Sequence, residues 1–112
     1  MRVERQDGHL PPAVVEDLLA EPRRRLLLAL LYRRGDRVSL TELSTELADE
    51  CGHGETPKER RNDVCQALRE TDLPKLVATD VVRYHSTLDA VMLSSSAAEL
   101  DDRLAAIAAE HE

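Results

Sequence analysis

The amino-acid sequence predicts a mainly α-helical fold with a small β-hairpin, and three observations support this prediction. Apolar residues make up 42% of the 112 residues, and most of them are Leu and Ala, which favour helices. Along most of the chain they recur at spacings of three and four, which is typical of amphipathic helices. Only the stretch after Val81 alternates with a period of two, as a strand does. A chain of this length has room for one modest core, so we expect a single domain.

The first third of the chain predicts an arm and two helices. Residues 1–11 are polar and show no periodicity, and a short amphipathic helix over 12–20 follows them. Pro22 begins a second helix that runs to Arg34, and Gly35 supplies the left-handed residue that commonly ends a helix. The leucines of this second helix cover a wide arc. We therefore expect it to be buried on more than one side, as the central helix of the core.

A short strand and a third helix come next. Residues 37–40 favour a strand of two or three residues. Ser39 and Glu42 then have the spacing of a capping box, in which each side chain accepts a hydrogen bond from the other residue's backbone, and they predict a helix over 40–49. The loop at 49–55 contains two glycines and no periodic pattern.

A second capping box begins the fourth helix. Thr56 and Glu59 have the required spacing, and they predict a helix over 57–70. We expect a kink near Thr71–Asp72, or a break into two helices, because Pro74 follows and the apolar spacing lengthens to five residues there.

Residues 81–93 predict the β-hairpin. Val82 and Tyr84 share one side of the first strand, and Val91 and Leu93 share one side of the second, with a turn at 86–89.

The C-terminal segment predicts a final helix. Ser96 and Glu99 have the spacing of a third capping box, and the apolar residues after them alternate at three and four. A lone helix of this length is marginal in water, so its apolar side needs a partner. We expect a homodimer in which this helix pairs through Leu100, Leu104 and Ile107. The alternative is that the helix packs back on its own domain.

This order of elements predicts a winged helix-turn-helix domain followed by a C-terminal helix. The boundaries are a polar arm at 1–11, the domain at 12–94 and the C-terminal helix at 95–112. In such a domain the 57–70 helix would enter the major groove of double-stranded DNA, with the 81–93 hairpin as the wing. Winged helices also serve as protein-docking modules, so the fold alone does not establish DNA binding.

Four stretches of sequence carry a resemblance to a known family. They are Leu18-Leu-Ala-Glu-Pro-Arg-Arg-Arg-Leu, Val38-Ser-Leu-Thr-Glu-Leu, Leu73-Pro-Lys-Leu and Val81-Val-Arg-Tyr. Over about residues 13–93 the chain resembles the winged-helix domain of a large haloarchaeal family of uncharacterised transcriptional regulators, and more distantly repressors of the arsenic-sensor type. In that family a His usually precedes Leu-Pro-Lys-Leu and a Gly usually precedes the wing, where this chain has Asp72 and Asp80. The resemblance implies a DNA-binding regulator.

The candidate DNA contacts lie on the fourth helix and on the hairpin. Lys58, Asn62 and Gln66, with Arg69 beyond them, fall on one helix face opposite Val64 and Leu68. Asn and Gln pair bidentately with adenine, while Arg and Lys contact guanine or phosphate. A solvated helix face is the alternative, since acids are interleaved with the bases. The full set of candidates is Lys58, Arg61, Asn62, Gln66, Arg69, Lys75, Arg83 and His85.

The densest basic region is at 22–37, where six arginines and one acid occur: Arg23–Arg25, Arg33, Arg34 and Arg37 are the arginines. Phosphate contact is one interpretation of these arginines. For the Arg23–Arg25 triplet we favour packing or ion pairs within the fold, and for Arg33 and Arg34 the alternative is a favourable interaction with the helix dipole.

Charge and composition indicate the cellular environment of the protein and the side that would face DNA. The chain has 22 acidic and 15 basic residues, a net charge of −7, and only two of the basic residues are Lys. This favours a salt-adapted cytoplasm, although a GC-rich genome also replaces Lys by Arg. The segment 56–85 carries +1 and the remainder −8, which favours DNA on that side. The net charge is the best argument for the rival class, a protein-docking module.

Several other classes of function are not expected. The N-terminus lacks a signal peptide, and the longest apolar run has seven residues, too few for a membrane span. Aromatic residues make up 2%, which disfavours base stacking on single strands. Cys51, His53 and Cys65 supply at most three of the four ligands of a structural zinc site. No catalytic triad or phosphate-binding loop is present, so we expect neither an enzyme nor a cofactor.

Overall fold

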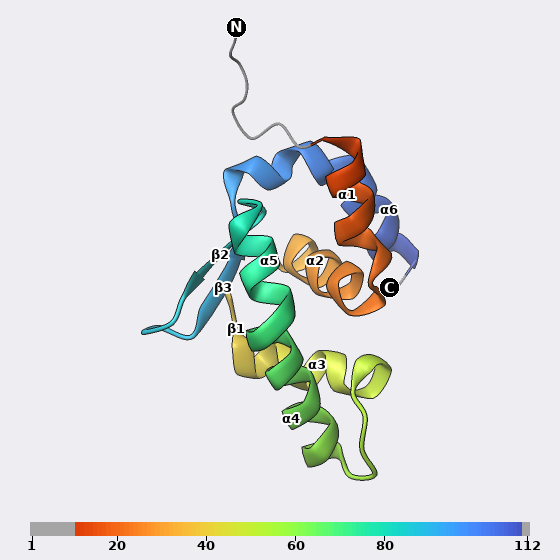
Figure 1. Cartoon of the computed structure of the whole chain (residues 1–112), viewed down its shortest axis with the longest axis vertical. Coiled ribbons are helices and arrows are strands. Elements are labelled where there is room, and N and C mark those ends of the chain that lie inside the picture. The colour runs from red at the N-terminus through yellow and green to blue at the C-terminus, as the bar shows by residue number, and fades with distance from the viewer. Residues whose placement is uncertain (1–10, 111–112) are drawn as a thin grey trace, which may run out of the picture.

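The structure, a computed structural model, describes residues 11–110, apart from the side chains of Ser96, Ala98 and Glu99. The predicted fold class, mainly α with a small hairpin, is confirmed (Figure 1). The elements are α1 (Pro12–Ala20), α2 (Pro22–Arg34), β1 (Val38–Ser39), α3 (Leu40–Cys51), α4 (Pro57–Ala67), a π-helix (Leu68–Asp72), α5 (Leu73–Ala78), β2 (Val82–His85), β3 (Ala90–Leu93), a 3-10 helix (Ser95–Leu100) and α6 (Asp101–Glu110). The expected polar arm lies outside the described residues except for Pro11.

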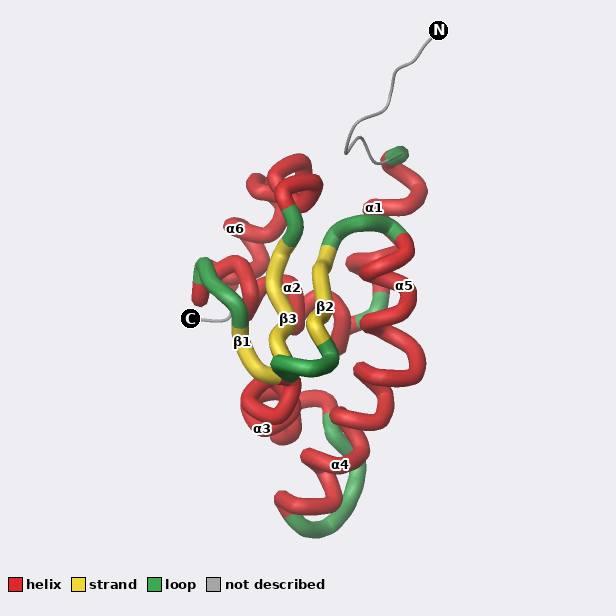
Figure 2. Tube along the Cα trace, turned by 90° about the vertical axis from the view of Figure 1, so that its left-hand side faces the viewer, coloured by secondary structure: helices red, strands yellow, loops and turns green. Residues whose placement is uncertain are grey.

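The three strands form one antiparallel sheet with β3 in the middle (Figure 2). Val91 of β3 pairs with Val38 of β1 on one side and with Tyr84 of β2 on the other. The short strand expected before the third helix is therefore present, and it joins the hairpin to the helical core. With α2, α3 and α4 this sheet makes the predicted winged helix-turn-helix.

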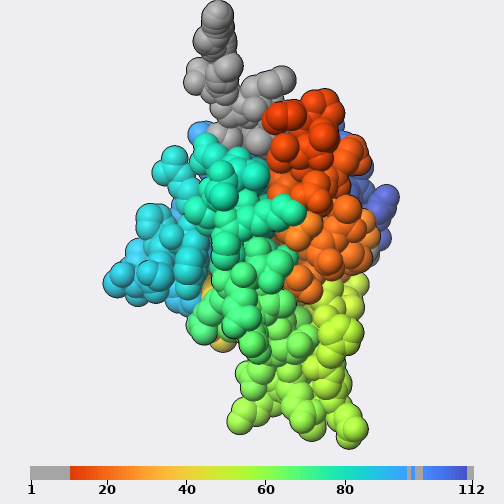
Figure 3. All heavy atoms as spheres, in the orientation of Figure 1, coloured from red at the N-terminus to blue at the C-terminus, as the bar shows by residue number. Residues whose placement is uncertain are grey.

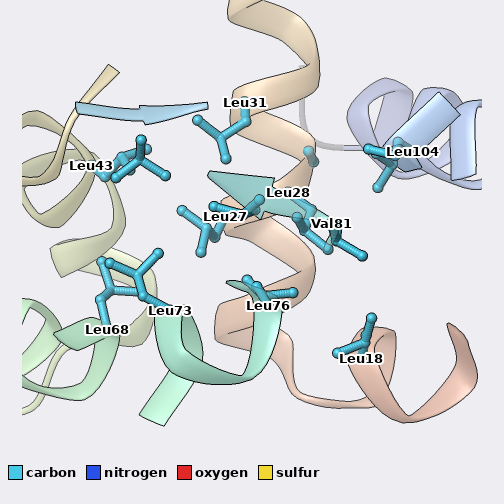
Figure 4. Close-up of a cluster of buried hydrophobic side chains, with 14 of the residues drawn as sticks. Leu18, Leu27, Leu28, Leu31, Leu43, Leu68, Leu73, Leu76, Val81 and Leu104 are labelled. Atoms are coloured by element: carbon cyan, nitrogen blue, oxygen red, sulfur yellow. The ribbon is translucent and has the colours of Figure 1, made fainter. Parts of the chain in front are cut away.

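Helix α2 is the centre of the core, as its wide apolar arc predicts. Leu27, Leu28 and Leu31 are fully or almost fully buried, and side chains from the helices and the hairpin surround them (Figure 4). The helix packs against α1, α3, α6 and β3. Helix α3 packs directly on α2, and α4 packs on α3, so the central helix supports α4 through α3.

Local signals in the sequence set the ends of these helices. The Ser39 hydroxyl accepts a hydrogen bond from the Glu42 backbone at 2.9 Å, which caps α3. The reciprocal bond of the predicted capping box is not formed, because the Glu42 carboxylate pairs with Arg34 instead. The capping box of Thr56 and Glu59 is complete and caps α4. Gly35 ends α2 in the left-handed conformation with φ 68°, as expected.

Two regions differ from the expectation. The predicted kink near Thr71–Asp72 is a π-helical stretch over 68–72, which absorbs the extra residue while the helix continues. The final α-helix begins at Asp101 rather than at residue 96. A 3-10 helix precedes it, because the chain leaves the sheet in a tight turn in which the Ala97 backbone N–H donates to the Ser94 carbonyl. The side chains of the expected third capping box lie outside the described ones.

No described helix has both the length and the apolar character needed to cross a membrane.

Candidate nucleic-acid interface

Helix α4 presents the polar face that the sequence predicts. Val64 is fully buried against the core, and so is Leu68 at the start of the π-helix. Lys58, Asn62 and Gln66 are exposed on the opposite side. Arg69, one turn further on, is exposed as well. The structure therefore brings four predicted DNA contacts together on one surface, which we call the α4 face.

The loop before α4 is held by contacts that leave this face uncovered. The Glu59 carboxylate accepts hydrogen bonds from the backbone N–H groups of Glu55 and Thr56, at 2.8 and 3.0 Å. These two bonds lower the pKa of Glu59 below its ordinary value. On the inner side, α3 approaches α4 so closely that a Cβ on Gly52 would lie 2.5 Å from the Arg60 carbonyl oxygen. Arg60 itself donates to carbonyls of the loop, so it belongs to the support of α4 rather than to its outer face.

The side chains of the α4 face differ in whether a bond within the chain must break before they can contact DNA. The side chains of Lys58, Asn62 and Arg69 make no hydrogen bond or ion pair with any other described residue. Gln66 donates from Nε2 to Glu70 Oε2 at 3.3 Å, so a contact to a base must replace this bond. Arg61 is only half-exposed and lies at the edge of the face.

Acidic groups gather along one edge of the α4 face. A shallow, open hollow there is lined by residues of the 53–55 loop and by four residues of α4, namely Glu59, Asn62, Asp63 and Gln66. Asp63 accepts a hydrogen bond from the His53 backbone N–H at 3.0 Å. Lys58 and Arg69 do not line this hollow. A phosphate is therefore better accommodated beside these two cations than in the hollow.

The hairpin carries the predicted wing residues on its outer surface. Arg83 and His85 are exposed, while Val82 between the sheet and the core is buried, as the period of two predicts. The turn at the tip is tied to the body, because the Leu40 backbone N–H at the start of α3 donates to the Asp89 carbonyl at 3.2 Å. The wing stands out from the body beside α5, against which β2 packs, in the space-filling view (Figure 3).

Lys75 does not lie with the other candidate contacts. It is on α5, beyond the π-helix, and its ammonium group pairs with the Asp17 carboxylate of α1 at 2.5 Å. The neighbouring ammonium group lowers the pKa of Asp17. Lys75 thus ties α5 to α1, and only a rearrangement of this pair would release it for DNA.

The side chains of the Arg23–Arg25 triplet make ion pairs and hydrogen bonds within the fold, which confirms the packing interpretation. Arg23 and Arg24 both pair with Asp72, whose side chain is fully buried. Arg24 also donates to the carbonyls of Asp17 and Leu18 at the end of α1. Arg25 donates to the next carbonyl of the same helix end, at 3.1 Å.

Sequence reasoning missed the role of Asp72. The buried pair with Asp72 raises the pKa of Arg23 and joins the start of α2 to the π-helix below α5. A signal was present: Asp72 stands at the point where the apolar spacing lengthens to five residues, between Leu68 and Leu73. A carboxylate at such a position needs a cation nearby, and the triplet supplies two.

The residues expected at a dimer seam are buried within the chain. Leu100, Leu104 and Ile107 are 1%, 0% and 8% exposed, and α6 packs on α2. These side chains cannot also form a seam with a second copy, because the helix already uses its apolar side in its own domain. The homodimer itself stays a prediction, and it requires another surface.

Cys51 and Cys65 are half-buried free thiols, and burial raises the pKa of Cys51. Within residues 11–110, no three His, Cys, Asp or Glu side chains are grouped so that they could hold a metal ion.

Part of the chain matches a protein family. The model of a family described as "Domain of unknown function (DUF7344)" matches residues 16–92, from α1 to the third strand. No curated protein and no solved structure matches the chain. The matched range contains the α4 face, the wing and the buried Asp72, and it ends before α6.

Proposed function

We propose that this chain, which belongs to the DUF7344 family, is a sequence-specific transcriptional regulator that binds double-stranded DNA. In this proposal α4 enters the major groove and the hairpin contacts the adjacent backbone. The observation that carries the proposal is the α4 face, where Lys58, Asn62, Gln66 and Arg69 are exposed on the outer side of the second helix of a helix-turn-helix.

The chemistry of the α4 face suits base recognition. Asn62 and Gln66 are the side-chain types that pair bidentately with adenine, and Arg69 and Lys58 suit guanine or phosphate. An α-helix is about 10–12 Å across, which fits a major groove about 12 Å wide, and α4 can extend along the groove for about 16 Å. Arg83 and His85 on the wing would position the domain through the phosphate backbone rather than read the sequence.

The setting that we propose is the cytoplasm of a halophilic archaeon. The resemblance to haloarchaeal regulators and the excess of acidic residues support it. At molar salt the Debye length is about 3 Å, so the net charge of −7 repels DNA only weakly and local contacts decide binding. We also propose a homodimer, because helix-turn-helix proteins commonly bind paired half-sites about one DNA turn apart.

The proposal is tested by fluorescence anisotropy with fragments of the source genome in molar KCl. Saturable binding to one upstream region supports a regulator. Absence of binding to every fragment supports the second candidate, a winged helix that docks on a protein, which the acidic net charge favours.

A double substitution on the α4 face makes the test specific. We expect Asn62→Ala with Gln66→Ala to weaken binding to the selected fragment, because each good bidentate contact contributes about 1–3 kcal/mol of discrimination. Both side chains are exposed and the net charge does not change, so the thermal unfolding should stay close to that of the parent. Asp102→Asn, on the exposed side of α6, is the control and should bind as the parent does. Unchanged affinity of the double variant would show that α4 does not read the bases.

A further inference from the structure

One side of the central helix remains incompletely covered. Leu26 and Leu30 of α2 are one helical turn apart and only partly buried, although they pack against the edge of the core. Together with Ala29 and with Leu47 of α3 they line a groove between the two helices. The apolar arc of α2 is therefore wider than its own domain covers, and the exposed remainder is concentrated in this groove.

The two walls of the groove carry charged residues of opposite sign. Arg33 stands on the α2 wall and Glu50 on the α3 wall. Within the part of the chain that the structure describes, neither side chain makes a hydrogen bond or an ion pair. Glu46 also lines the α3 wall, but it is already paired with Arg34 at 2.9 Å, and Arg34 pairs with Glu42 as well, at 2.6 Å.

We propose that this groove is the surface on which two copies of the chain associate about a twofold axis. In a twofold interface each contact between unlike residues occurs twice, so a surface must be complementary to itself. An apolar strip with one unpaired cation on one wall and one unpaired anion on the other meets this requirement. Leu26 and Leu30 of the two copies pack together at the centre, and Arg33 of each copy pairs with Glu50 of the other.

The position of the groove suits the dimer on which the proposed function rests. Its lining comes from α2 and α3 alone, so association there leaves the α4 face and the wing uncovered. In the space-filling view, α2 (orange) and α3 (yellow-green) adjoin on the side of the molecule away from the wing (Figure 3). The residues of α6 that were expected at the seam are already buried in the core, so this groove replaces them as the site of association.

The apolar part of the proposal is tested by light scattering at micromolar concentration in molar KCl. We expect the parent to have the mass of two chains and Leu26→Glu to have the mass of one, with an increase in the dimer dissociation constant of about tenfold or more. Leu88→Glu, at the wing tip where the parent side chain is 65% exposed, is the matched control and should remain dimeric. A monomeric parent, or a dimeric Leu26→Glu, would overturn the proposal.

A charge exchange tests the twofold geometry without relying on a substitution near the core. Arg33→Glu places two acids opposite each other in a homodimer, and Glu50→Arg places two bases opposite each other, so each variant alone should dissociate. An equimolar mixture restores both opposite-charge contacts, and we expect it to form heterodimers with the mass of two chains. The mixture is measured at the lowest KCl concentration at which circular dichroism shows the parent to be folded, because salt screens exposed ion pairs.

The two single variants should be as helical as the parent, since both positions are exposed. A mixture that stays monomeric while each variant is folded would show that these residues do not face each other across a twofold axis. None of these measurements contains DNA. Failure of the dimer and failure of DNA binding are therefore separate results.

Discussion

A single buried carboxylate, Asp72, connects the middle of the α4–α5 segment to the start of α2. Its side chain is fully buried, and Arg23 and Arg24 supply the charges that make this burial tolerable. Arg24 extends the connection to α1 through two backbone carbonyls. This ion-paired cluster therefore acts together with the packing of α4 on α3 to fix the direction in which α4 points from the core.

We expect Asp72→Asn to destabilise the fold strongly. The substitution keeps the shape but leaves Arg24, which is 8% exposed, without its buried counter-charge. Breaking a buried pair by removing one partner costs about 3–5 kcal/mol. Urea unfolding at constant KCl, followed by circular dichroism, measures the loss. Asp49→Asn is the control, because the pair of Asp49 with Arg60 is long, at 3.9 Å, and exposed, and such pairs contribute about 1 kcal/mol or less. Equal stability of the two variants would contradict the role of Asp72.

For single residues, the sequence predicts the solvent exposure of a side chain better than it predicts its hydrogen-bond or ion-pair partner. The helical period places Asn62 and Gln66 opposite Val64, and these positions are confirmed. The same period does not show that Gln66 bonds to Glu70 or that Lys75 pairs with Asp17 on a helix more than fifty residues away. Such pairs depend on how helices are arranged in space, which local spacing does not determine.

Among the elements, α4 has the most clearly defined N-terminus. The Glu59 carboxylate accepts two backbone N–H groups of the preceding loop, and these bonds lower its pKa. Since the pKa is lower in the folded chain than in the unfolded chain, the stabilisation by this cap is complete above the ordinary pKa of a glutamate. It is lost as the pH falls through the lowered value.

We expect the cap to be detectable because the two amides that it binds should report the same titration, that of the Glu59 carboxylate. The amide proton signals of Glu55 and Thr56 should shift together as Glu59 takes up its proton, with a midpoint below the ordinary glutamate pKa of about 4.3. Nuclear magnetic resonance spectra recorded from pH 7 downward measure this midpoint. Glu59→Gln should remove the titration from both amides. A midpoint at or above the ordinary value in the parent would show that the cap does not form.

The elements themselves were largely predictable because their ends carry local signals. Ser39 and Thr56 cap helices, and Gly35 ends one, for reasons that operate within a few residues. The π-helix over 68–72 and the 3-10 helix before α6 were not predicted in type, because burial of Asp72 and the path of the chain out of the sheet decide them. The apolar spacing of α6 is the same for packing within a chain and between chains, so it could not distinguish the two.

Across the whole molecule, the balance of charge sets the conditions under which the fold is stable. The chain has 22 acidic residues against 15 basic ones, and most acidic residues of the described part are exposed. At low ionic strength these carboxylates repel one another over about 10 Å or more, and the compact state brings them closer than the unfolded chain does. Salt therefore weakens a repulsion between carboxylates that destabilises the folded state more than the unfolded state.

Salt has three other effects on stability, of which one opposes the relief of repulsion, one is small and one adds to the relief. Exposed ion pairs such as Arg103 with Glu16, at 2.7 Å, are weakened by salt, but each contributes only about 0–1 kcal/mol. The buried pairs of Asp72 are reached little by mobile ions and should change little. Salting-out adds to the stabilisation of the buried apolar core. The relief of repulsion and the gain in burial together outweigh the loss of a few exposed pairs.

We therefore expect the melting temperature to rise by several degrees or more between low and molar KCl, since 1 kcal/mol corresponds to about 4–8 °C in a domain of this size. Thermal unfolding followed by circular dichroism at a series of KCl concentrations measures the rise. A variant with Asp101→Asn and Asp102→Asn, two exposed acids at the start of α6, separates repulsion from the general effect of salt. It should show a smaller gain from KCl than the parent, because part of the repulsion has been removed in advance. A melting temperature that does not depend on KCl would contradict adaptation to a salt-rich cytoplasm, and with it the argument that the net charge of −7 permits DNA binding.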